Sequence, residues 1–214
     1  MSERTPVGVL VSGSGTNLDA LLRACATPDF PARVALVVSN RRSARALEVA
    51  RARGVPAAAL PQSDFDGDPS ARDREIHRRF RAAGVRLVVC AGYDRILSEE
   101  FLDAYPDAIL NVHPSLLPAF AGGMDAVERA LARGVRVSGC TVQLLERGEA
   151  DGGPIVLQAA VPVESDDDAA TLRSRIHERE WELLPRAVAL WSTDRLQRDG
   201  DRVRILPAPA AASV

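Results

Sequence analysis

Lysine is absent from this chain of 214 residues, and its 27 basic side chains are all arginines. The absence excludes a lysine that acts as a general base or forms a Schiff base with a carbonyl substrate. We interpret it as a genomic coding bias rather than as a functional feature. The arginines produce no basic excess, because the formal net charge is −2. A nucleic-acid-binding surface normally shows such an excess, so we expect no nucleic-acid partner.

Cysteine is also scarce. Cys25, Cys90 and Cys140 are widely spaced and odd in number, so they predict no disulfide framework, and no pair has the spacing of metal ligands. Each lies in an apolar run, which predicts a buried thiol that packs as a small hydrophobic group. The histidines lack metal-ligand spacing as well, and we expect no metal. His77 and His177 lie among charged residues of predicted helices, where we expect both to be exposed.

Long hydrophobic segments are missing too. The N-terminal residues hold no apolar stretch of signal-peptide length, and no segment approaches the length of a membrane span. We therefore expect a cytoplasmic protein without a membrane partner. The composition, 46% hydrophobic and 26% charged, is that of an ordinary globular protein, and the length fits one domain.

The first half of the chain alternates β-branched apolar runs with amphipathic stretches. The apolar runs predict strands over 7–12, 34–39 and 87–91, and the helical spacing predicts helices over 17–26, 44–53 and 70–83. Strands that are apolar on both faces and alternate with helices are typical of a parallel, doubly wound α/β sheet.

The second half predicts a different arrangement. A strand over 109–113 and a short helix over 125–132 precede two strands over 135–145 and 155–163. The glycine-rich turn between these two strands leaves no room for a crossover helix, so we expect antiparallel neighbours and a mixed sheet. A long helix follows over 169–191, with a bend expected at Pro185.

A glycine-rich segment, Ser12–Asn17 (SGSGTN), connects the first predicted strand to the first helix. Backbone N–H groups and the partial positive charge of a helix N-terminus favour an anion there, most often a phosphate. The segment matches neither common nucleotide loop, and no acidic residue for a ribose follows about 20 positions later. The alternative is an ordinary strand-to-helix turn.

Asn111 and His113 alternate on one strand and therefore share a face at its carboxyl end. An imidazole can transfer protons near neutral pH, and a carboxamide can donate to a developing oxyanion. Asp151 begins a glycine-rich turn and could approach and orient a histidine. The alternatives are a buried histidine bonded to backbone and a common Asp-Gly turn.

In this order, the segments resemble the phosphoribosylglycinamide formyltransferases of the folate-dependent formyltransferase superfamily. The resemblance runs from Val7 to about Trp191. The block LNVHPSLLP, with DGGP about forty residues later, is specific to the superfamily, and SGSGTN narrows it to the glycinamide branch. Methionyl-tRNA formyltransferases share the histidine block, but they lack this loop and carry a further C-terminal domain. The matching segments are Gly13–Asn17, Ala91–Leu97, Asn111–Pro118, Ser138–Val142 and Asp151–Gln158.

The resemblance implies roles for individual residues of this chain. Gly15, Thr16 and Asn17 would hold the phosphate of the glycinamide ribonucleotide (GAR), and Glu180 would bind its ribose hydroxyls. Asn111, His113 and Asp151 would form the catalytic set. The folate side would be bound by Asp94, Arg95, Ile96, Leu97, Asn111, Glu146 and Asp151, with Asp94–Leu97 and 146–151 as the wall of the pterin pocket.

The resemblance also implies the formyltransferase fold, which is Rossmann-like: a doubly wound, mostly parallel sheet with antiparallel C-terminal strands. We expect one domain over 1–214, with a phosphate-binding half over about 1–105, a catalytic and folate-binding half over about 106–200, and a frayed tail over 207–214. The implied reaction formylates the amine of GAR in purine biosynthesis. The formyl donor, 10-formyltetrahydrofolate, is a co-substrate, so no bound cofactor is expected, and the protein would be a monomer or a homodimer.

The sequence departs from the family pattern in three places. Asp125 and Gln143 stand at or near positions where the family usually has histidines, and an arginine expected before the third helix is not clearly placed between Pro69 and Arg72. These departures concern folate contacts more than the catalytic set. Two rival functions are a hydrolase that deformylates the same folate and a nucleotide-binding module without catalysis. The hydrolase would need water in place of an amine acceptor and typically an additional N-terminal regulatory domain, for which we expect no room before Val7. The module would leave the Asn111, His113 and Asp151 set unexplained.

Overall fold

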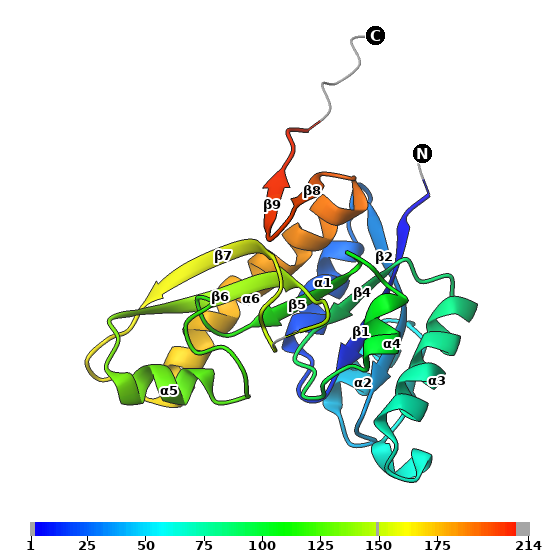
Figure 1. The fold of residues 1–214 in the computed structure, drawn as a ribbon, viewed down its shortest axis with the longest axis horizontal. Helices are drawn as coiled ribbons and strands as arrows, with labels where there is room; N and C mark the ends of the chain where they lie inside the picture. Colours follow the sequence, from blue (N-terminus) through cyan, green and yellow to red (C-terminus); the bar gives the residue numbers. More distant parts are fainter. Residues whose placement is uncertain (1–2, 149, 209–214) are drawn as a thin grey trace.

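The computed structural model describes residues 3–148 and 150–208, and most of the expected frayed tail lies outside this part. The described strands form one nine-stranded sheet in the order β3-β2-β1-β4-β5-β6-β7-β9-β8 (Figure 1). In the first half the elements are β1 (Thr5–Val11), α1 (Thr16–Cys25), β2 (Ala32–Ser39), α2 (Arg45–Ala52), β3 (Ala57–Ala59), the 3₁₀ helix η1 (Gln62–Phe65), α3 (Pro69–Ala82), β4 (Leu87–Cys90) and α4 (Glu99–Asp103). In the second half they are β5 (Ile109–His113), α5 (Ala126–Arg133), β6 (Val137–Leu144), β7 (Ile155–Pro162), α6 (Ala169–Ser192), β8 (Leu196–Asp199) and β9 (Arg202–Ile205).

The first five strands of the sheet order, from β3 to β5, are all parallel. Helices α1, α2 and α6 pack on one face of the sheet through one apolar core, and α3 and α4 pack on the other face through a second core (Figure 1). The central strands are buried on both faces, which explains their unbroken apolar runs. The expected doubly wound α/β arrangement is confirmed.

The sheet changes direction at β5. Strand β6 pairs antiparallel with β5, and β7 pairs antiparallel with β6, so the sheet is mixed as expected. His113 is the last residue of β5, and this strand has the predicted bounds. The change of direction therefore falls at the strand that carries Asn111 and His113.

Helix α6 crosses behind both halves of the sheet and packs against α1, β6 and β7 (Figure 1). Its 24 residues begin at a capping box, in which the Asp168 carboxylate accepts from the Thr171 backbone and the Thr171 hydroxyl accepts from the Asp168 backbone. The helix continues through Pro185, and the bend expected there stays a prediction. Because α6 touches α1, it brings residues near position 180 to the loop that precedes α1.

Several short elements are absent from the sequence prediction. Strand β3 consists of three alanines, and the five-residue α4 is too short to show helical spacing. The hairpin of β8 and β9 is mostly exposed and rich in charged residues, so it lacks the apolar runs that predict buried strands. It adds the last two strands to the sheet beside β7.

The three cysteines are buried, as predicted from their apolar runs. Burial raises the pKa of the Cys25 thiol to about 11 and the pKa values of Cys90 and Cys140 to about 12. These thiols therefore stay protonated near neutral pH and pack as hydrophobic groups. Within the described residues, no helix combines the length and the apolar character that a membrane crossing requires.

Candidate active site

Asn111 and His113 lie at the carboxyl end of β5, where ligand sites of α/β sheets usually form. His113 is only 4% exposed, whereas Asn111 is half-buried. Across the antiparallel pair, Asn111 faces Gln143 of β6, and His113 faces Thr141. The strand pair thus holds an imidazole and two carboxamides close together.

Asp151 reaches this strand end from the turn between β6 and β7. Its backbone is left-handed, with φ of 60°, a conformation that few residues other than glycine adopt. Its Oδ2 lies 3.2 Å from Nδ1 of His113, and its Oδ1 accepts from Nδ2 of Asn111 over 3.4 Å. The structure therefore brings together the three residues of the predicted catalytic set.

Two further donors hold the Asp151 carboxylate. The side-chain amide of Gln143 donates to Oδ1 over 3.0 Å, and the backbone N–H of Gly122 donates to Oδ2 over 3.0 Å. Sequence reasoning noted Gln143 only as a departure from the family pattern. Its place opposite Asn111 follows from strand register, which the sequence alone does not specify.

The other ring nitrogen of His113 contacts the segment between β5 and α5. Nε2 lies 3.2 Å from the carbonyl oxygen of Phe120. A carbonyl oxygen and a carboxylate both accept hydrogen bonds, so each ring nitrogen of His113 faces an acceptor. Arg129 braces this segment by donating to the carbonyls of Ala121 and Gly122 over 3.1 Å and 2.8 Å.

The glycine-rich loop lies at the N-terminus of α1. Gly15 is the residue before the helix and has φ of 81°, while Gly13 and Ser14 are exposed. A Cβ on Gly15 would lie 2.7 Å from Cα of Ala46 in α2, whereas a Cβ on Gly13 would meet nothing within 4 Å. Gly15 is therefore required by the contact between α1 and α2, in addition to any ligand. Thr16 is the first residue of the helix.

Asn17 and Glu180 are joined by a buried hydrogen bond, in which Nδ2 of Asn17 donates to Oε2 of Glu180 over 2.7 Å. Glu180 is 3% exposed, and burial raises the pKa of its carboxyl group, although Asn17, His177 and His113 act in the opposite direction. His177 lies 3.9 Å from Glu180, and its ring stacks on Trp181. The expectation that His177 is simply exposed is wrong, since its side chain is half-buried beside this carboxylate.

Asp94 faces the ends of β1 and β2. Its carboxylate accepts from Ser12 over 3.0 Å and from Asn40 over 2.8 Å, and it forms an ion pair with Arg41. Burial opposes ionisation of Asp94, but these bonds and the charges of Arg41 and Arg95 outweigh it, so its pKa is lowered. The sequence could have indicated this cluster, because its members follow three parallel strands.

The other residues of the predicted pterin wall differ in their exposure to solvent. Ile96 is 84% exposed and Arg95 is exposed, whereas Leu97 is buried in the core beneath α3 and α4. Glu146 accepts from Arg198 of the C-terminal hairpin over 2.5 Å. Glu146 lines a cleft of about 520 Å³ whose other walls are Leu102, Asp103, Pro106, Asp107, Leu145, Arg147 and Arg198.

The positions that depart from the family pattern have separate environments. Asp125 precedes α5, is exposed, and has its nearest charged neighbour in Arg129 at 3.9 Å. Arg72 is buried and forms an ion pair with Asp73 over 2.8 Å. Its guanidinium therefore bonds to a neighbouring side chain within the core. Pro69 is the first residue of α3.

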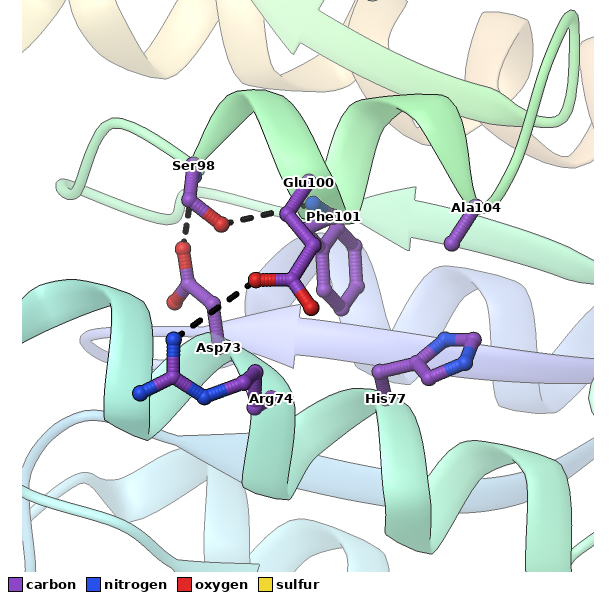
Figure 2. A pocket seen from close by; sticks show the side chains of 7 residues that line it. All are labelled: Asp73, Arg74, His77, Ser98, Glu100, Phe101 and Ala104. Atoms are coloured by element: carbon purple, nitrogen blue, oxygen red, sulfur yellow. Dashed lines mark hydrogen bonds and ion pairs between the residues drawn. The ribbon is translucent and has the colours of Figure 1, made fainter.

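A smaller cavity of about 80 Å³ lies between α3 and α4 (Figure 2). His77 borders it, with its ring edge-on to Phe101 and Tyr105 at centroid distances of 6.5 Å and 5.4 Å. The expectation that His77 is a solvated surface residue is wrong, because its side chain is half-buried against aromatic side chains of α4 and its flank. None of the predicted site residues lines this cavity. Its lining consists of Asp73, Arg74, His77, Ser98, Glu100, Phe101 and Ala104.

No group of three or more histidine, cysteine or acidic side chains suited to a metal ion occurs in residues 3–148 and 150–208. The polar groups of the site are instead an imidazole, two carboxamides and a carboxylate, beside a glycine-rich helix N-terminus. The fold and these side chains define an α/β enzyme with proton-transfer groups at a strand end.

The family model for formyl transferase matches residues 6–188. The chain belongs to the formyl transferase family.

Named relatives support this assignment. The chain is 36% identical to a phosphoribosylglycinamide formyltransferase of Haemophilus influenzae, over 95% of this chain and 94% of that protein. It is 38% identical to the trifunctional purine biosynthetic protein adenosine-3 of Gallus gallus, over 92% of this chain but only 19% of that protein's length. Among solved structures, glycinamide ribonucleotide transformylase 1 of Symbiobacterium toebii is 45% identical, with a TM-score of 0.93 over 97% of this chain and 96% of that one.

Proposed function

We propose that this protein transfers the formyl group of 10-formyltetrahydrofolate to the amine of GAR in purine biosynthesis. The observation that carries the proposal is the convergence of His113, Asn111 and Asp151 at one strand end, in a chain whose full-length relatives are named for this reaction. The protein would act in the cytoplasm as a monomer or a homodimer, without a nucleic-acid or membrane partner.

The glycine-rich loop and Glu180 would bind GAR. The backbone at Gly15 and Thr16 and the side chain of Asn17 would hold the phosphate at the N-terminus of α1. Glu180 would accept hydrogen bonds from the ribose hydroxyls. The hydrogen bond between Asn17 and Glu180 supports this division, because it joins the expected phosphate and ribose contacts.

The amine of GAR would attack the formyl carbon and form a tetrahedral intermediate with an oxyanion. The new bond joins this carbon to the GAR nitrogen, and the bond from the carbon to the folate nitrogen then breaks. The amide of Asn111 and Nε2 of His113 would donate to the oxyanion, and His113 would relay the amine proton to the departing nitrogen. For this step Nε2 exchanges its contact with the Phe120 carbonyl for one with the substrate.

Asp151 would orient His113 through Nδ1, and its turn would form part of the folate pocket. The segment Asp94–Leu97 and Glu146 would provide the pterin wall. The exposed Ile96 supports this role, because an apolar side chain that is 84% exposed can be covered by a flat ring. Folate would therefore bind between the β6–β7 turn and the segment after β4.

A transfer assay with GAR and 10-formyltetrahydrofolate tests the proposal. The wild type should form formylated GAR and tetrahydrofolate in equal amounts, and His113→Ala should lower kcat by about 10²–10⁴, the range for a positioned acid or base. Release of formate at a rate independent of GAR would instead show the deformylase. Binding of GAR without product, and no binding of a folate analogue, would show a nucleotide-binding module.

A further inference from the structure

Gln143 lies at the centre of the site but has no part in the chemistry proposed above. It is fully buried on β6, directly opposite Asn111 in the β5–β6 pair. Opposite residues of an antiparallel pair present their side chains on the same face, so the two amides are neighbours. The two amides also share an acceptor, which is Oδ1 of Asp151.

Gln143 makes the shorter of the two contacts to that oxygen. Its Nε2 donates over 3.0 Å, which is the usual length of such a bond, whereas Nδ2 of Asn111 is 3.4 Å away and makes a weaker contact. Gly122 and His113 hold the other oxygen, Oδ2, over 3.0 Å and 3.2 Å. The carboxylate therefore keeps a good donor on each oxygen when Asn111 turns away.

The backbone conformation of Asp151 explains why contacts to its carboxylate matter. A left-handed backbone with φ of 60° is uncommon for a residue other than glycine, although aspartate tolerates it better than most, and contacts of the side chain help to keep Asp151 in this conformation. The amide of Gln143 is such a contact. Its Oε1 is also buried without a hydrogen-bond partner among the described residues, which is unfavourable for stability alone.

We propose that Gln143 is a positioning residue for formyl transfer, an inference that rests on the proposed function. Its amide holds Oδ1 of Asp151 while the amide of Asn111 turns from that oxygen to the developing oxyanion. Without Gln143, this movement would leave a carboxylate oxygen unpaired, so Asn111 would be retained on Asp151 and the transition state would lose a donor.

Gln143→Leu tests this role with a side chain of similar volume that cannot donate. We expect kcat to fall about tenfold to a hundredfold, the scale of one lost hydrogen bond to a charged group, while KM for both substrates changes little. Folding should be retained, because the substitution also removes the unpaired Oε1; a thermal melt checks it.

Gln143→Glu provides the second variant. It places a carboxyl group within hydrogen-bond distance of the Asp151 carboxylate, so the two groups compete for one proton. At acidic pH the protonated glutamate can donate and transfer should proceed. As the pH rises, repulsion between the two carboxylates should displace Asp151. The kcat of the variant should then decrease with pH over a range in which the wild-type kcat does not.

Gln158→Leu is the matched control on the neighbouring strand β7. Its amide donates to the Leu117 carbonyl and the Thr141 hydroxyl over 3.0 Å, and no contact with Asp151 occurs among the described hydrogen bonds. Its kcat–pH profile should keep the wild-type shape.

Wild-type kcat and pH profile in both folded Gln143 variants would overturn the inference, as would a raised KM with unchanged kcat. These outcomes leave the proposed function intact, provided that the wild type transfers formyl to GAR. An inactive wild type would overturn the proposed function, and the positioning role with it.

Discussion

At the scale of one residue, Glu180 is a buried acidic group whose proposed role in binding opposes the stability of the free protein. Its carboxylate is 3% exposed on α6, and the hydrogen bond from Asn17 is its only one among the described contacts. Removing a charge from water is unfavourable unless hydrogen bonds or opposite charges compensate, and here burial dominates the shift of its pKa. In the proposed function the ribose hydroxyls of GAR supply the missing donors.

Glu180→Gln should therefore stabilise the free protein and weaken its binding of GAR. The folded-state pKa of Glu180 is raised above the unfolded value of about 4.3, so its stabilising effect is complete below that pH and is lost as the pH rises through the folded pKa. Glutamine does not titrate. The Tm of the variant should exceed that of the wild type by a margin that grows from acidic to neutral pH, and calorimetry should show GAR binding weaker by about 1–3 kcal/mol.

Glu182→Gln is the control on the same helix, since the side chain of Glu182 is 63% exposed and pairs with Arg179 at the surface. It should change neither the GAR affinity nor the pH dependence of Tm. A Tm of Glu180→Gln below that of the wild type at neutral pH would show that the Asn17 bond outweighs the burial of the charge.

The strand period predicted that Asn111 and His113 share a face, because residues two apart on a strand point the same way. The approach of Asp151 from another turn came from the resemblance rather than from spacing. Gln143 was not predicted to touch Asp151, because its register against Asn111 depends on the pairing of β5 with β6. The partial burial of His77 and His177 was missed because the charged neighbours of both residues outweighed other signals; the aromatic partners of His77 come from a separate helix and its flank, whereas Trp181 lies four residues after His177 and could have indicated the stacking.

At the scale of elements, Gly15 serves the contact between α1 and α2. The backbone of Ala46 lies so close that a Cβ on Gly15 would be 2.7 Å from Cα of Ala46. The N–H of Ala46 also donates to the carbonyl of Gly13 over 3.1 Å, which fixes the loop to the start of α2. The loop is therefore shaped by the packing of helices before any ligand binds.

Substitutions at the two glycines should separate packing from ligand binding. Gly15→Ala should lower the free energy of unfolding by at least about 1–3 kcal/mol, because alanine is strained at positive φ and clashes with α2. Gly13→Ala should fold normally, since its Cβ enters open space, but the methyl group at the loop should raise KM for GAR. Thermal melts measure the change in stability, and transfer kinetics measure the change in KM for GAR. An unchanged KM in Gly13→Ala would place the phosphate away from this loop.

Most long elements agree with the sequence prediction within two residues, because apolar runs and helical spacing report burial directly. The predicted strands over 34–39 and 155–163, for example, correspond to β2 (Ala32–Ser39) and β7 (Ile155–Pro162). The prediction failed for the hairpin β8–β9, whose residues are mostly exposed and gain strand structure from pairing at the edge of the sheet. Edge pairing leaves little apolar pattern in the sequence.

At the scale of the whole molecule, the site takes residues from both the parallel and the antiparallel part of the sheet. Parallel strands β1, β4 and β5 place their carboxyl ends at one edge of the sheet, where the glycine-rich loop follows β1, Asp94 follows β4 and His113 ends β5. The antiparallel strand β6 then brings Gln143 alongside Asn111. In the proposed function, the mixed sheet combines a phosphate-binding edge with a second strand that supports the proton-transfer groups.

GAR should stabilise the whole molecule when it binds. At a concentration one hundred times its Kd, a ligand that binds only the folded state adds about 2.7 kcal/mol, which raises Tm by roughly 5–10 °C for a chain of this size. Thermal melts with increasing GAR measure this shift. A shift with the folate analogue but none with GAR would contradict the assignment of the ribonucleotide to this site.

The hydrogen bond between Asn17 and Glu180 joins residues 163 positions apart. A ribosome makes the glycine-rich loop early, and the parallel strands around it have local crossover connections that can form while synthesis continues. The proposed ribose contact at Glu180, however, cannot form until α6 has emerged and has packed against α1. In the proposed function, a nascent chain therefore lacks a complete ribonucleotide site until α6 has folded, and its affinity for GAR should rise abruptly at that point.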